Sequence, residues 1–459
     1  MTQQHIPARF KEVTMKRFSP ALGFVTMLLA SCSSTTDTSD QPATDTPAEA
    51  GSPPTGSSGT GSESASAAIG ARAESLRSEL IDMRREIHRH PELSGQEVQT
   101  AALIEARLRA QGLEVRTGVG GHGVVGVLRG GRPGPVVAYR ADMDAMPNQE
   151  PPGRAYGSTV PNVFHVCGHD LHSTIGVGVA TALASMRDQL QGTAVFLFQP
   201  AEETVEGAAA MLRDGALDGL DPQVIYGLHS FPNHVGTVFA QGTALAGFDN
   251  FTITLDTEHS TPEMENKLKA DLAPIGTIAP PETGDDIAKF VADLQDPNGP
   301  YDETVFLRVS SSTVDDRLVL RGSLKASDDS AYERIRDAVR EAVAREVPEG
   351  TYELAFRDGG PFPAMRSDNQ VADRTAATLA HVVGKENVLS MHGTVPYASE
   401  DFAFFLQRTP GVMVLLGVEN REKGFSGFPH FPDFDADEDA IVIGTKAMST
   451  VIWDHLSKQ

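Results

Sequence analysis

Short runs of apolar residues alternate with helical patterns along much of this sequence, and that alternation is the strongest constraint on its fold. The runs occupy residues 136–139, 194–198, 224–228 and 412–416. A strand that is apolar on both faces must be covered by helices on both sides. The sequence therefore predicts an α/β fold in which helices cover both faces of a mixed sheet.

The pattern changes after residue 243. Half-exposed strands and two helices are expected there in the order β-α-β-β-α-β, which is the ferredoxin-like split unit. Their residues are 251–255, 285–294, 304–309, 317–324, 330–347 and 352–356. The segment after Pro262 is rich in proline, glycine and charge, which predicts a loop.

Uniformly apolar runs resume after residue 360, so the small unit interrupts a larger one. We expect the larger domain at residues 71–243 and 361–459, with an inserted α+β satellite domain at 244–360. More than one domain also suits a chain of 459 residues, because single hydrophobic cores stop growing at about 250–300 residues.

The N-terminus has the layout of a secretory signal, predicted to occupy residues 1–31. Lys16 and Arg17 precede an apolar run at 21–29 that is too short to span a bilayer. The following Leu-Ala-Ser-Cys resembles the bacterial lipobox, which implies cleavage before Cys32 and a lipid on that residue. The low apolar content of residues 32–70 predicts a disordered tether. We therefore expect a protein held to a bacterial membrane only by its lipid, facing the periplasm or cell exterior, with Ser33 favouring the outer membrane.

The net charge excludes one class of binding partner, and the cysteine count limits the role of Cys167. Lys and Arg number 38 against 62 Asp and Glu, a net charge of −24, which repels nucleic acid. The chain has two cysteines. With Cys32 carrying lipid, Cys167 has no disulfide partner, so in an oxidising compartment it must be buried or held by a metal.

Residues 164–172 concentrate metal-binding side chains: a thiol, three imidazoles and a carboxylate. Thiolate and imidazole both bind borderline metals such as zinc, and Gly168 lets the backbone bend so that Cys167 and His169 converge. The alternative is a strand-to-helix turn with a buried cysteine and partly exposed histidines.

Further polar groups follow the apolar runs, where ligands gather in open α/β sheets. Glu202 and Glu203 follow 194–198, His229 follows 224–228, and His430 lies in a loop of aromatic residues and prolines. Each alone also fits a simpler interpretation, such as a surface histidine or an acidic pair in the first turn of a helix. Together they place several metal-ligand types at one edge of the sheet.

In order and spacing, RADMD at 140–144, HVCGHD at 165–170, FQPAEE at 198–203, GLH at 227–229 and the loop at His430 resemble a known family. It is the aminoacylase/carboxypeptidase amidohydrolase family, in the branch of hippurate hydrolase and the indoleacetyl-amino acid hydrolases. The resemblance covers roughly residues 75 to 455. It implies a two-metal catalytic domain with an inserted lid-like satellite, which cleaves the amide bond of N-acyl amino acids or small peptide-like amides.

The resemblance also implies residue roles. Two divalent ions (zinc, manganese, cobalt or nickel) would be held by Cys167, His169, Glu203, His229 and His430, with Cys167 bridging them. Glu202 would be the general base that activates a metal-bound water. Asp144 and Asp170 would orient ligand imidazoles. Asp142 stands where sister branches have a ligand histidine, although a metal role for it is not favoured.

The satellite segment departs from the family. Residues 255–262 keep only His259 and Pro262 of a Gly-rich stretch, and Lys325 stands where an arginine is expected. His259 would polarise the scissile carbonyl, or it is an exposed histidine at a strand end. Two alternatives therefore stay open, a carboxypeptidase acting on short peptides and a degenerate lipoprotein that only binds metal or ligand. A homodimer formed through the satellite domain is also considered.

Overall fold

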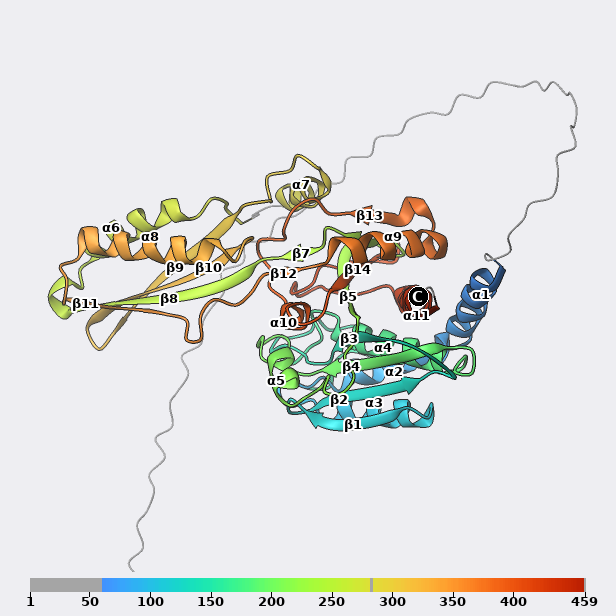
Figure 1. The fold of residues 1–459 in the computed structure, drawn as a ribbon. Helices are drawn as coiled ribbons and strands as arrows, with labels where there is room; N and C mark the ends of the chain where they lie inside the picture. Colours follow the sequence, from blue (N-terminus) through green and yellow to red (C-terminus); the bar gives the residue numbers. More distant parts are fainter. Residues whose placement is uncertain (1–59, 281–283, 458–459) are drawn as a thin grey trace, which may run out of the picture. The chain divides into compact units, whose positions relative to one another are not determined.

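The computed structural model describes residues 60–280 and 284–457 (Figure 1). An eight-stranded sheet has the order β1-β2-β4-β3-β5-β14-β6-β13. Its strands are β1 Glu114–Val119, β2 Gly123–Arg129, β3 Arg132–Asp142, β4 Gln191–Gln199, β5 Val224–His234, β6 Val238–Gln241, β13 Val388–Ser390 and β14 Gly411–Glu419. β3 runs parallel to β4 and β5, and β5 parallel to β14, whereas β2 is antiparallel to β4. The sheet is therefore mixed, as predicted.

Helices cover both faces of this sheet, which confirms the predicted fold class. In β4, Phe196 packs into one core cluster, whereas Val195 and Leu197 pack into another on the opposite face. The first cluster draws on α1 Thr60–Ser75, α2 Arg77–Arg89, α3 Val98–Ala110, α4 His169–Ala184, α9 Asn369–Val383 and α11 Asp439–Ser457. The second draws on α5 Gly207–Arg213, α7 Gly284–Gln295 and α10 Phe402–Leu406.

The disordered tether predicted for residues 32–70 is wrong from residue 60 onward, where a helix begins. Helix α1 begins at Thr60, and its Ala65 and Ile69 are buried in the core. Composition was misleading because the alanines and serines of this segment suit close helix packing as well as disorder. Residues 1–59, with the predicted signal peptide and Cys32, lie outside the described part of the chain.

A second sheet of four antiparallel strands has the order β11-β8-β10-β9. Its elements follow the predicted β-α-β-β-α-β order: β8 Gly247–Leu255, α6 Pro262–Leu272, β9 Val305–Val314, β10 Arg317–Ala326, α8 Ala331–Glu346 and β11 Tyr352–Phe356. Both helices share a separate hydrophobic core with the strands. The exact domain bounds, 71–243, 244–360 and 361–459, stay a prediction.

The first helix of this unit is not the predicted one. Residues 262–272, expected to be a loop, form α6, which buries Leu268 and Leu272. The Thr261 side chain accepts a hydrogen bond from the Met264 N–H, and Pro262 fits the first turn, so residues taken for loop formers begin a helix. The predicted helix at 285–294 exists as α7, but its Phe290 and Leu294 pack with the larger sheet's core.

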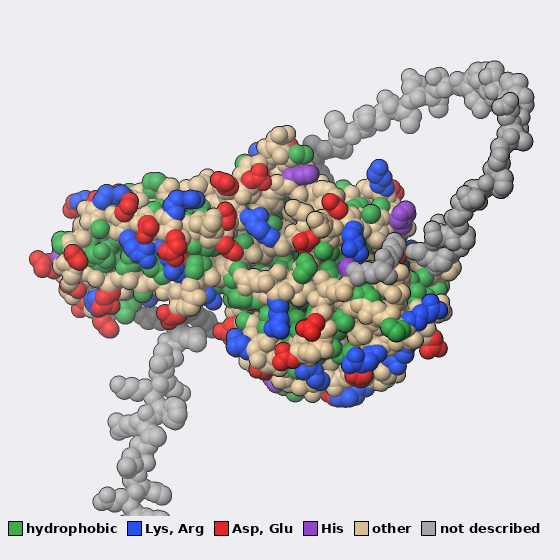
Figure 2. Space-filling model, in the orientation of Figure 1, with side chains coloured by type: hydrophobic (Ala, Val, Ile, Leu, Met, Phe, Trp, Pro, Cys, Tyr) green, Lys and Arg blue, Asp and Glu red, His purple; other side chains and the backbone are tan. Residues whose placement is uncertain are grey.

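Short elements complete the fold. Strands β7 Ala244–Leu245 and β12 Met365–Arg366 pair with each other, and the 3₁₀ turns are η1 Thr257–His259, η2 Ala273–Ile275 and η3 Lys385–Asn387. Acidic and basic side chains are interspersed over the face seen in Figure 2. Among residues 60–280 and 284–457, no helix has the length and apolar character needed to cross a membrane.

Candidate metal centre and active site

The residues singled out as ligands come from elements of the larger sheet and from the turns and loops beside them. Cys167 precedes α4, His169 is the first residue of α4, and His229 lies in β5. Between Cys167 and His169, Gly168 has φ +89°, a left-handed conformation that bends the chain as expected. A Cβ there would come 3.0 Å from Ser230 Oγ. Glycine therefore fits both the left-handed backbone conformation and the limited space beside Ser230.

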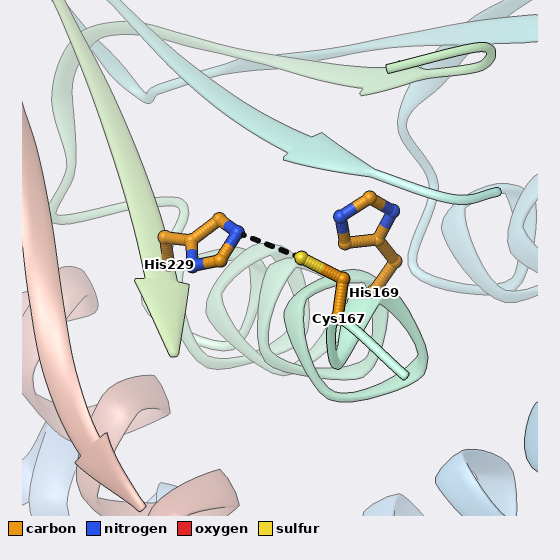
Figure 3. Close-up of side chains that lie close together, drawn as sticks. All are labelled: Cys167, His169 and His229. Atoms are coloured by element: carbon orange, nitrogen blue, oxygen red, sulfur yellow. Dashed lines mark hydrogen bonds between the residues drawn. The ribbon is translucent and has the colours of Figure 1, made fainter. Parts of the chain in front are cut away.

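Cys167 is the centre of the cluster. Its Sγ lies 3.3 Å from Nε2 of His229 and 3.2 Å from Nε2 of His430. Figure 3 shows Cys167 between the imidazoles of His229 and His169. His430 has φ +65°, a strained backbone for a residue with a side chain, and its N–H donates to Val166 O at 2.9 Å. That hydrogen bond holds the loop of His430 next to the segment of Cys167, although the two are distant in sequence.

Two groups of donor atoms share this thiol. Sγ of Cys167 lies with donor atoms of His169 and His229 in one group, and with donor atoms of Glu203 and His430 in another, all within 4.8 Å of one another in each group. A third group joins His169 to Glu202 and Glu203. Two overlapping sets that share one sulfur fit two metal ions bridged by Cys167.

The hydrogen bonding of the donors also fits metal ions. Nε2 of His169 and Oε1 of Glu203 are buried, 3.8 Å apart, and lack hydrogen-bond partners among the residues that the structure describes. Buried polar atoms are rarely left so, unless an ion or water meets them. The other nitrogen of each imidazole is engaged: His169 Nδ1 faces Asp144 Oδ1 at 3.2 Å, and His229 Nδ1 donates to Ser230 O at 2.7 Å. These bonds direct both Nε2 atoms toward the cluster.

Asp144 and Asp170 differ in their contacts. Asp144 contacts the imidazole of His169, as expected. Asp170 contacts no ligand imidazole, so its expected role is wrong. Its Oδ2 lies 2.7 Å from His88 Nδ1 and 3.1 Å from Arg84 Nε. One residue beyond His169 on a helix, its side chain points about 100° away, toward α2.

Asp142 and His172 bond to each other rather than offering free ligand atoms. His172 Nδ1 lies 2.7 Å from Asp142 Oδ1, and His172 Nε2 accepts the Ser230 N–H at 2.7 Å. Asp142 also accepts a hydrogen bond from Arg140 at 2.6 Å, although its Oδ1 lies 3.8 Å from His169 Nε2. This geometry agrees with the view that Asp142 is not a favoured ligand.

Glu202 is buried beside the cluster, with Oε2 3.8 Å from Nε2 of His169. Burial raises its pKa well above the usual carboxyl value, and the nearby carboxylate of Glu400 raises it further. A buried carboxylate next to a candidate metal pair has the position that a general base needs.

The sequence interpretation missed a buried ionic network behind Glu202. Arg140 is fully buried and bonds to Glu400 at 2.9 Å and to Asp401 at 3.1 Å. Its Nε also donates to Gln199 Oε1 at 2.8 Å. The acidic pair directly before α10 was the available signal, but no apolar run precedes it to indicate a strand end.

Lys325 reaches the site from β10 of the smaller sheet. Its Nζ donates to Ser399 Oγ at 3.0 Å. Burial lowers the pKa of Lys325 to about 8, although Glu202 acts in the opposite direction. The position expected to hold an arginine thus places an amine beside the candidate base.

His259 lies far from the cluster of its own chain, so the carbonyl-polarising role is not met there. Lys325, which reaches the site, pairs with Phe248 near the start of β8, whereas His259 follows the other end of that strand, Leu255. Leu255 lies seven residue steps along β8 from Phe248, about 23 Å at about 3.3 Å per step. The sequence could not reveal this distance, because it depends on the direction of β8.

The model of peptidase family M20/M25/M40 matches residues 138–454. The chain belongs to this family. It is 30% identical to N-acetylcysteine deacetylase of Bacillus subtilis over 81% of this chain and 96% of that protein. It is 32% identical to thermostable carboxypeptidase 2 of Saccharolobus solfataricus over 80% of this chain and 93% of that protein.

A solved structure agrees with the M20 assignment. A dinuclear metal-binding peptidase of the M20 family from Bacillus subtilis matches with a TM-score of 0.66 and 26% identity, covering 84% of this chain and 100% of that one. These findings confirm the resemblance and the fold class. The M20 chain is a metal-dependent amidohydrolase, so the degenerate binding protein is not supported.

Proposed function

We propose that this M20 protein cleaves the amide bond of N-acyl amino acids or small peptide-like amides. Two divalent ions would be held by Cys167, His169, Glu203, His229 and His430, in two donor groups that share Cys167. The observation that carries the proposal is the pair of donor groups sharing Cys167, with the buried carboxylate of Glu202 beside them. The deacetylase and carboxypeptidase relatives support amide substrates.

The ions would supply a polarised water and offset negative charge at the carbonyl oxygen. Glu202 takes the proton of the attacking water and returns it to the leaving amine. Asp144 keeps Nε2 of His169 directed at the cluster, and His229 is oriented through its bond to Ser230 O. Arg140 offsets the charge of Glu400 and Asp401, which would otherwise repel the anionic form of Glu202.

A hydrolysis panel tests this function. The purified protein, loaded in turn with zinc, manganese, cobalt or nickel, is offered N-acyl amino acids and dipeptides. Release of free amino acid from the acylated substrates, faster than from dipeptides, is the expected result. Faster cleavage of dipeptides would favour the carboxypeptidase alternative, and cleavage of neither class with any of the four metals would overturn the proposal.

We also propose that the enzyme is anchored by a lipid on Cys32 and faces the periplasm or cell exterior. The basic pair, the apolar run and Leu29-Ala30-Ser31-Cys32 support this location. The native chain should partition into detergent from the membrane fraction, whereas Cys32→Ser should not. Membrane partitioning of the Cys32→Ser protein at the native level would refute the anchor.

Finally, we propose a homodimer in which His259 serves the site of a second copy, because it lies too far from its own cluster. Glu202→Gln and His259→Ala chains would be inactive alone. Mixed dimers would regain activity, because one site would combine an intact Glu202 with an intact His259. Activity in the His259→Ala protein alone, or none in mixed dimers, would contradict the proposal.

A further inference from the structure

The turn that carries Glu202 and Glu203 has a strained backbone. Ala201 has φ +53° and Val205 has φ +54°, in the left-handed region that residues with a side chain seldom adopt. Such conformations persist only where surrounding contacts hold them, and they concentrate at functional sites. Something outside the turn must therefore hold it.

Two buried carboxylates accept hydrogen bonds from backbone N–H groups of the turn, one on each side of Glu202. Oδ2 of Asp144 accepts the Glu203 N–H at 3.0 Å. Oε1 of Glu97 accepts the Ala201 N–H at 2.8 Å. The first contact comes from the segment after β3, and the second from the start of α3.

Both carboxylates are themselves fixed by one short segment. The Gly95 N–H donates to Oε1 of Glu97 at 2.8 Å, and the Ser94 hydroxyl donates to Oδ2 of Asp144 at 2.6 Å. Residues 94–97 therefore position both acceptors that hold the turn.

Glu97 is poorly explained as a purely structural residue. It is 0% exposed, and its Oε2 is buried with no hydrogen-bond partner within residues 60–280 and 284–457, a costly arrangement for a carboxyl group. Although it directly precedes α3, its side chain makes no capping bond to that helix. Glu92 caps it instead, accepting the N–H groups of Gln99 and Thr100, each at 2.9 Å.

We propose that Glu97 is a positioning residue that sets the turn of Glu202 and Glu203 through the Ala201 N–H. Glu97 belongs to none of the donor groups found among the described residues. Its effect is to fix where the base and the ligand carboxylate point. This inference rests on the roles proposed above for Glu202 and Glu203.

The test compares Glu97→Ala with Glu97→Gln, which keeps an acceptor oxygen, and with the control Glu92→Ala. Zinc affinity of the metal-free protein is measured by competition with a chromogenic chelator, together with kcat, KM and the thermal midpoint. Glu97→Ala should lose about 10–100-fold in zinc affinity and in kcat, the usual cost of losing a partner behind a metal ligand, with KM little changed. Glu97→Gln should recover most of both. Glu92→Ala should lower the midpoint but keep zinc affinity and kcat.

Native zinc affinity and kcat in Glu97→Ala would overturn the proposal, as would equal losses in Glu92→Ala. If Glu97→Ala does not fold, Glu97→Asp replaces it, because the shorter side chain cannot reach Ala201. If Glu97→Asp and Glu97→Gln then had equal zinc affinity and equal kcat, the proposal would be overturned. A native protein that binds zinc but hydrolyses no amide would refute the proposed function instead, and zinc affinity would still test Glu97.

Discussion

Glu202 and Glu203 are neighbours in sequence, and we propose different roles for them, a general base and a metal ligand. The Oε1 atom of Glu203 lies 3.8 Å from His169 Nε2 and has no hydrogen-bond partner in the described part of the chain, as suits a ligand, whereas Glu202 lies among buried carboxylates. Removing the base from such a site typically costs 10²–10⁴-fold in rate. Cys167, in contrast, belongs to two donor groups, one with His169 and His229 and one with Glu203 and His430.

This division predicts different outcomes for two matched variants. Glu202→Gln should keep metal content and KM while kcat falls by about 10²–10⁴-fold. Glu203→Gln should lose metal first and activity as a consequence, so added metal restores part of its rate. Metal analysis and steady-state kinetics of both proteins check this. Native turnover in Glu202→Gln would rule out the base.

At the scale of elements, a buried ionic network joins α2 to the start of α4. Asp170, next to the proposed ligand His169, bonds to His88 and Arg84, and His88 Nε2 lies 3.0 Å from Glu150. Burial opposes the charged form of His88, but its bonds to Asp170 and Glu150 outweigh that and raise its pKa. The network therefore supports helix α4, which begins with His169, a proposed metal ligand.

A raised His88 pKa makes its contribution depend on pH. The stabilisation is fully present below the unfolded pKa of about 6.5 and is lost as pH rises through the higher folded pKa. His88→Gln should therefore cost about 3 kcal/mol at pH 6, and less at pH 9. Urea unfolding at both values measures this. His90→Gln, at the same helix end with its side chain 43% exposed, should show little change at either, and an equal His88→Gln cost at both would contradict the prediction.

Most of helix α1 was missed by the sequence prediction, because the composition of residues 60–70 indicated disorder. Ile69 is fully buried in the core cluster that also contains residues of α4 and α11. Ile69→Ala should therefore destabilise the fold by about 2–4 kcal/mol, the usual cost of such a cavity. Ala71→Ser in the same helix, at an exposed position, is the control. Denaturant unfolding that shows no difference between the two variants would place α1 outside the cooperative core.

At the scale of the whole molecule, the site takes residues from both sheets. Lys325 extends from β10 to Ser399, beside carboxylates of the larger domain. A cation in this acidic site is suited to the α-carboxylate that N-acyl amino acids and peptides share. The smaller sheet would then help to select the substrate.

Lys325→Met should raise KM for an N-acyl amino acid about 10–100-fold, the worth of a charged hydrogen bond, and leave KM unchanged for the matching amino acid amide. Because burial lowers the Lys325 pKa to about 8, kcat/KM for the free acid should fall as pH rises through that value. Kinetics with both substrates between pH 6 and 10 check this. An equal rise in KM for both would assign Lys325 a structural role.

Local patterns in the sequence were enough to predict the mixed sheet, its covered faces and the sequence positions of the cluster. Apolar residues on both faces of a strand require burial whatever its neighbours, and polar groups after such strands meet at one edge. Residues 262–272 were misread because their charges obscured the apolar spacing of Leu268 and Leu272.

Only the tertiary structure could decide contacts between elements distant in sequence. Asp170 turns to α2 because of its angle on α4, Glu97 meets Ala201 across 104 positions, and Arg140 gathers Glu400 and Asp401. The direction of β8 carries His259 away from its own cluster. Such contacts depend on how packed elements are placed and oriented, which short-range periodicity does not encode.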